Sequence, residues 1–169
     1  YYDVNTPAQD RYRHFIAGLS AGVKFEIGPI DLGSAIDRNA RWDARSGQWI
    51  PTTGVQLNTG ADHRWLASFC QEHGLKPSFA VFDSMHILNL GTVVDWGLAG
   101  PAPLLVKLFL AHGNAAPKTL LFLLDRLKDI LPQWRTCWMP VSTGSDQLPL
   151  AALALSLGGH VRVGIGDYS

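Results

Sequence analysis

The stretch that decides the fold is residues 104–110, which read LLVKLFL. This run is almost continuously apolar, and it is too short for a typical helix. A short apolar run of this kind predicts a strand buried on both faces, as strands are in a parallel sheet that helices cover. The sequence therefore predicts an α/β fold at this point of the chain.

Strand-like and helix-like segments alternate on both sides of this run. Further strands are predicted at residues 23–27, 78–83, 136–142 and 161–165, and helices at residues 6–20, 62–73, 87–98, 117–131 and 146–157. The units repeat at roughly 25 to 30 residues, which is the size of a βα unit. The pattern predicts five parallel strands, each followed by a helix except the last. Residues 28–60 are rich in Gly, Pro, Asn, Asp and Thr and predict a long loop.

Two architectures are compatible with five parallel strands. One is an intact doubly wound sheet, and the other is part of a (β/α)8 barrel, which needs about 250 residues when complete. The chain has 169 residues. Neither a GxGxxG motif nor a P-loop motif occurs, which argues against the usual nucleotide sites. The strand pattern alone leaves both architectures open.

Composition and charge narrow the class of protein. Hydrophobic residues make up 47% and charged residues 17%, which is typical of a globular domain. The formal net charge is zero and no basic run occurs, so we expect neither nucleic acid nor a membrane as a partner. Cys70 and Cys137 are far apart, as in a cytoplasmic protein with reduced thiols. Unpaired sheet edges need covering, either by upstream residues or by another subunit, and we also expect a homo-oligomer.

A family resemblance rests on the end of the chain. Residues 158–167 read GGHVRVGIGD and resemble the GGHVRVGLED signature of the β-keto acid cleavage enzymes, also called 3-keto-5-aminohexanoate cleavage enzymes. Two further segments agree in order. Residues 74–83 resemble that family's GLKP strand ending in VFD, and residues 138–150 resemble its segment ending in QLPL. The resemblance covers nearly the whole chain.

The resemblance implies a fold and a reaction. It implies a zinc-dependent (β/α)8 barrel, of which residues 1–169 would form a single partial domain with about five βα units, strands 4 to 8. Family members convert acetyl-CoA and a β-keto acid into acetoacetate and a new acyl-CoA. The expected partners are therefore these small molecules, with acetyl-CoA as co-substrate and zinc as the family's metal.

The resemblance also assigns residues. Arg162 and Asp167 stand at the family's catalytic arginine and aspartate. Gly166 stands where the family has a zinc-binding glutamate, and the chain has no HxH motif for the two histidine ligands. We therefore expect no metal ligand within this chain. The glycine favours an alternative, a catalytically degenerate barrel that serves as a binding or assembly subunit.

Other candidates follow the predicted strands, where barrel enzymes place their functional groups. The candidate substrate-binding residues are Asp31, Gly33, Ser34, Asp83, His86 and His112. Each also has a structural interpretation. Asp83 can cap the next helix, and Gly33 with Ser34 can form an ordinary turn. Arg162 lies in an apolar strand and needs a carboxylate partner or a ligand; Asp31, Asp83 and Asp167 are the candidate carboxylates.

Overall fold

The computed structural model describes residues 6–36, 40–51, 55–110, 115–142, 147–164 and 167. The helices are α1 (Ala8–Arg11), α2 (Arg13–Ser20), α3 (Gly60–Glu72), α4 (Ser84–Asp95), α5 (Pro117–Ile130) and α6 (Leu148–Ser156). The strands are β1 (Ile27–Asp31), β2 (Ala35–Ile36), β3 (Ala40–Asp43), β4 (Gln48–Pro51), β5 (Val55–Gln56), β6 (Lys76–Val81), β7 (Leu104–Phe109) and β8 (Thr136–Val141). None of the described helices is long and apolar enough to cross a membrane.

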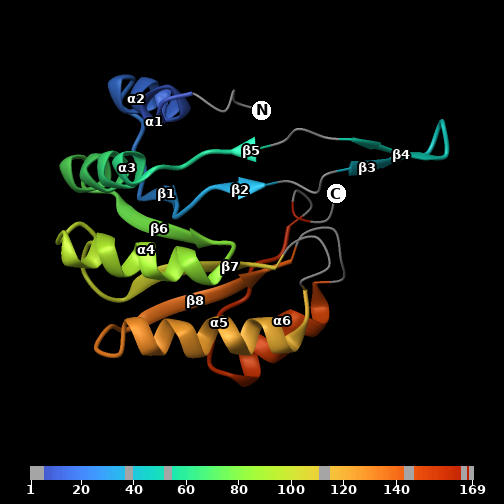
Figure 1. Ribbon diagram of the computed structural model, residues 1–169. Helices are drawn as coiled ribbons and strands as arrows, with labels where there is room; N and C mark the ends of the chain where they lie inside the picture. Colours follow the sequence, from blue (N-terminus) through green and yellow to red (C-terminus); the bar gives the residue numbers. More distant parts are fainter. Residues whose placement is uncertain are drawn as a thin grey trace.

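The main sheet has the strand order β1-β6-β7-β8, and every neighbouring pair is parallel. This confirms the predicted α/β class and the parallel pairing. Helix α3 packs against β1 and β6, α4 packs against β6, and α6 packs against β8. Figure 1 shows the strands following one another across the molecule with the helices alongside. A four-stranded parallel sheet of this kind is consistent with part of a barrel wall.

The two faces of the sheet differ in burial. Burial alternates along β7. Leu104, Val106 and Leu108 are fully buried. The alternate residues Lys107 and Phe109 are partly exposed. Successive strand residues point to opposite faces, so one face packs on helices and the other is open. Within the described residues, β7 is therefore fully buried on the helix side and only partly buried on its other face.

Two predicted strands need correction. The first lies at Ile27–Asp31 instead of residues 23–27, because its register against β6 begins with Ile27 opposite Lys76. Pro29 is tolerated there because its backbone faces the edge of β1 that does not pair with β6, so its missing N–H leaves no sheet partner unbonded. The Pro29 carbonyl accepts a hydrogen bond from Tyr12 at that edge. The second is the strand predicted at residues 161–165, since residues 161–164 form no strand. Val163 is 58% exposed, so this segment lacks the packing that a central strand requires.

The predicted long loop at residues 28–60 is also wrong. It contains β1 and two short antiparallel pairs, β2 with β5 and β3 with β4. The β3–β4 pair is a hairpin in which Trp42 lies opposite Trp49, with ring centroids 5.6 Å apart. Asp43 accepts a hydrogen bond from the backbone of Ser46 and fixes the turn. Figure 1 shows this hairpin extending away from the main sheet.

Candidate functional site

The open face of the sheet carries two successive rows of side chains near the carboxyl ends of the strands. The register places Asp31, Ala80, Lys107 and Met139 side by side in the first row. Neighbouring strands lie about 4.8 Å apart. Because Ala80 presents only a methyl group, it leaves room between Asp31 and Lys107. This row therefore holds one anionic and one cationic side chain on an otherwise apolar surface.

Two aromatic rings form the second row, closer to the strand ends. Phe82 follows β6 and Phe109 ends β7, and their rings are stacked with centroids 4.5 Å apart. The guanidinium carbon of Arg162 lies 5.7 Å from the centroid of the Phe109 ring. The C-terminal segment thus returns to the carboxyl ends of the strands, although it does not join the sheet.

Arg162 and Asp167 form an ion pair with two hydrogen bonds. The Nη2 and Nε atoms of Arg162 donate to the two carboxylate oxygens of Asp167 at 3.0 and 3.2 Å. This side-on geometry fixes the orientation of the carboxylate. The side chains are 38% and 14% exposed, so the pair remains accessible to a small molecule. Among the carboxylates that the sequence offered to Arg162, Asp167 is the hydrogen-bonded partner.

Lys107 is a residue of this site that sequence reasoning missed. Burial lowers the pKa of its ammonium group, the nearby charge of Asp31 raises it, and the charge of Arg162 lowers it again. These contributions place Lys107 within electrostatic range of both residues. The available signal in the sequence was one charged residue inside an apolar strand, where an uncompensated charge is costly.

Of the predicted candidates, the structure brings Gly33 and His86 into contact. His86 is 5% exposed, and its Nδ1 accepts a hydrogen bond from the backbone of Phe82 at 3.2 Å. Burial lowers its pKa, and Asp83, the backbone of Ser34 and Asp31 raise it. A Cβ atom at Gly33 would overlap Nε2 of this ring. His86 thus joins the ends of β1 and β6 as a neutral imidazole.

The remaining candidates have structural partners. Asp83 caps α4 by accepting a hydrogen bond from the backbone of Met85 at 2.7 Å. The hydroxyl of Ser34 accepts one from the backbone of Asn58 at 3.0 Å. Asp31 lies in the first row beside Lys107, as the register requires. His112 and Gly166 lie outside the described residues.

The described residues do not fit a zinc site. Within the described ranges, no three His, Cys, Asp or Glu side chains lie close enough together to hold a metal ion. Burial raises the pKa of the Cys70 thiol to about 12, so this thiol stays protonated and is a poor ligand.

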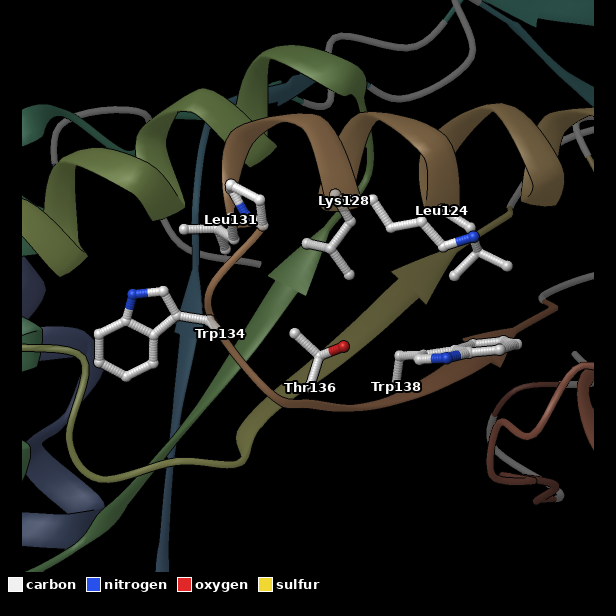
Figure 2. A pocket seen from close by; sticks show the side chains of 8 residues that line it. Leu124, Lys128, Leu131, Trp134, Thr136 and Trp138 are labelled. Atoms are coloured by element: carbon white, nitrogen blue, oxygen red, sulfur yellow. The ribbon is translucent and has the colours of Figure 1, made fainter.

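A separate cavity lies between α5 and β8. It has a volume of about 120 Å³. Figure 2 shows Leu124 and Lys128 of α5 facing Thr136 and Trp138 of β8 across it. Trp138 pairs in register with the buried Val106, so this cavity is on the helix side of the sheet. It is therefore distinct from the site on the open face.

Replacing Gly33 by Ala should destabilise the protein by about 1–3 kcal/mol, the usual cost of overpacking a filled site. The added methyl group would overlap the buried ring of His86. Urea unfolding measures the effect. Gly60→Ala is the matched control, because a Cβ atom there meets no atom within 4 Å. Equal stability of the two variants would contradict the contact.

The stability of the protein should fall as the pH falls below about 6.5, the ordinary pKa of histidine. His63 and His86 are buried, and burial is the main reason that both pKa values are lowered. The unfolded chain therefore binds protons at a higher pH than the folded chain, so stability is fully present above that pH and declines below it.

Urea unfolding at pH 7.5 and pH 5.5 tests this pH dependence. The unfolding midpoint should be lower at pH 5.5, and His86→Gln should reduce the difference. At pH 5.5 an ordinary aspartate is still ionised, so carboxylates contribute little to the change. Identical midpoints at both pH values would contradict the assignment of neutral, buried histidines.

The chain is similar to one family of proteins over nearly its whole length. The model of the beta-keto acid cleavage enzyme family matches residues 3–169. A 3,5-dioxohexanoate:acetyl-CoA acetone transferase of Paraburkholderia graminis is 32% identical over 114 residues, which cover 67% of this chain and 37% of that protein.

Solved structures agree on the fold. The apo structure of ObcA has a TM-score of 0.59 at 15% identity and covers 84% of this chain and 34% of that one. The ternary complex of ObcA with a C4-CoA adduct and oxalate has a TM-score of 0.60 at the same identity. The chain spans little more than a third of the length of these proteins.

Proposed function

Because the chain belongs to the β-keto acid cleavage enzyme family, we propose that the protein cleaves a β-keto acid with acetyl-CoA, giving acetoacetate and a new acyl-CoA. The observation that carries the proposal is the Arg162–Asp167 pair beside Phe109, at the carboxyl ends of the parallel strands. Barrel enzymes place their catalytic groups at that end. The name of the acetyl-CoA-dependent relative supports the same class of reaction.

In this proposal Asp167 acts as the base. Its carboxylate takes a proton from the carbon between the keto and carboxylate groups of the substrate, and that carbon then attacks the thioester of acetyl-CoA. The thiolate of CoA leaves and attacks the keto carbon of the original substrate. The bond between that carbon and the former methylene then breaks, which gives the new acyl-CoA and the carbanion of acetoacetate. That carbanion takes back the proton from Asp167, and acetoacetate leaves. Arg162 orients the base through its two hydrogen bonds and offers positive charge to the substrate carboxylate.

We place β1, β6, β7 and β8 in the wall of a (β/α)8 barrel, with residues 1–169 as one partial domain. The candidate residues divide accordingly. Arg162 and Asp167 act on the substrate, and Asp31 contributes to the surface beneath them. Gly33, Ser34, Asp83 and His86 shape the strand ends through the contacts described above. His112 follows β7 in the chain and stays a prediction for substrate binding.

A second candidate function is that of a non-catalytic binding or assembly subunit. Such a subunit would act within the homo-oligomer that the sequence predicts. The observation that favours it is that the described residues contain no group of three potential metal ligands. Metal analysis of the full-length protein separates the two functions. About one tightly bound zinc per chain favours the enzyme, and its absence together with inactivity favours the subunit.

Chromatography of CoA thioesters tests the proposed reaction. The full-length protein is incubated with acetyl-CoA and a panel of β-keto acids that differ in the group beyond the keto carbon. We expect one new acyl-CoA to form as acetyl-CoA is consumed, in equal amounts with acetoacetate. Unchanged acetyl-CoA with every substrate, with and without added zinc, would overturn the proposal.

A further inference from the structure

Lys107 has an unusual position for a charged residue. Its strand neighbours Val106 and Leu108 are fully buried on the helix side, so Lys107 points to the open face. It lies one row deeper than Phe109, which is a separation of about 7 Å along a strand. The stacked rings of Phe82 and Phe109 stand at the strand ends, one row above Lys107. A substrate held by the Arg162–Asp167 pair and extending inward along this face would bring its far end toward Lys107.

The electrostatics of this row favour an anionic ligand. Asp31 stands across Ala80 in the same row and attracts the ammonium group, yet burial and the charge of Arg162 outweigh it and lower the pKa of Lys107. The positive charge of the ammonium group is thus less well stabilised in this site than in water. An anionic group bound beside it would restore that compensation and gain a charge-assisted hydrogen bond.

We propose that Lys107 is a specificity residue that binds a second carboxylate, at the far end of the substrate, so that the protein selects β-keto dicarboxylic acids. This inference rests on the proposed function, because Arg162 and Asp167 must hold the reacting end. It goes beyond that function by naming the class of substrate. Lys107 makes no covalent bond and takes no part in the bond-breaking steps.

The test compares two substrates of equal length, 3-oxoadipate with a terminal carboxylate and 3-oxohexanoate with a terminal methyl group. The full-length protein is assayed with acetyl-CoA and each substrate. The wild type should prefer 3-oxoadipate in kcat/KM. Lys107→Met should reduce kcat/KM for 3-oxoadipate by about tenfold or more and leave the value for 3-oxohexanoate unchanged or higher. Lys107→Arg should retain the preference, because it keeps the charge.

Two controls make the result specific. Lys118→Met removes an exposed lysine of α5 and should leave both substrates unchanged. Thermal unfolding of each variant shows whether it is folded. An equal loss for both substrates in Lys107→Met, or no loss for either, would overturn the inference while leaving the proposed function in place.

A binding measurement separates this inference from the proposed function. Adipate and hexanoate lack the keto group and cannot react, and calorimetry measures their affinity directly. The wild type should bind adipate more tightly than hexanoate, and Lys107→Met should lose that difference. If the wild type shows no preference for adipate, the inference fails whether or not the protein is active. If the preference depends on Lys107 but no β-keto acid is cleaved, the proposed function fails and the binding site stands.

Discussion

Replacing Asp167 by Asn should lower the turnover of the full-length protein by about 10²–10⁴-fold, the usual contribution of a general base. The amide keeps the size of the side chain but cannot take a proton from the substrate. Because the Arg162–Asp167 pair is partly exposed, its loss should cost little stability, about 1 kcal/mol or less. The reduced rate would therefore report on chemistry, and a matching thermal unfolding curve would show that the fold is intact.

The controls for this prediction use the same two residue types. Asp129→Asn alters an exposed carboxylate on α5 and should leave turnover unchanged. Arg162→Lys keeps the positive charge but loses the two-pronged hydrogen bond, so it should also reduce turnover. A rate for Asp167→Asn within twofold of the wild type would show that Asp167 is not the base.

Replacing Phe79 by Ala should destabilise the protein by about 3–5 kcal/mol, the range for deleting a buried aromatic ring. Phe79 lies in β6 with no exposed surface, opposite Ile30 of β1 and Val106 of β7. Loss of its ring would leave a cavity where the helices pack on the sheet. Such a cost is a large part of the stability of an ordinary domain.

Urea unfolding measures this second effect, with Phe122→Ala as the control. Phe122 is 53% exposed on α5, so its replacement should cost well under half as much. Similar losses for the two variants, or a loss below about 1 kcal/mol for Phe79→Ala, would contradict the assignment of the helix-facing core.

The elements that could be predicted from the sequence are those with a complete local signal. Strand β7 was predicted from a continuous apolar run, and α5 from the proline at its first position and a proline after its end. Helix α3 begins one residue after Thr59, which caps it together with Asp62. Their bounds differ from the predicted ones by only a few residues, because propensity and packing favour the same structure.

The elements that were missed depend on partners distant in sequence. Pro29 argues against a strand, but β1 places it where its missing N–H is not needed by β6. The β3–β4 hairpin is short and carries half-exposed tryptophans, so it has little apolar alternation to detect. Conversely, residues 161–164 have the pattern of a strand but no strand partner among the described residues. In all three cases, hydrogen bonding to a neighbouring strand determines whether the segment forms a strand.

The candidate site was predictable in part. The Arg162–Asp167 pair was among the expected pairings, and the contact between His86 and Gly33 joins two predicted residues. Lys107 could not be identified from the sequence, because it is a single charged residue in an otherwise apolar run. Its proximity to Asp31 arises from the strand register, across a whole intervening strand, and no local pattern contains that information.

Isotope tracing tests the central claim most directly. The full-length protein is given acetyl-CoA labelled with ¹³C at the carbonyl carbon and an unlabelled β-keto acid, and the products are analysed by mass spectrometry. If the reaction is β-keto acid cleavage, the label will be found at the keto carbon of acetoacetate, and the new acyl-CoA will be unlabelled. If the label instead appears in free acetate, or remains in acetyl-CoA while the β-keto acid persists, the protein does not catalyse this reaction.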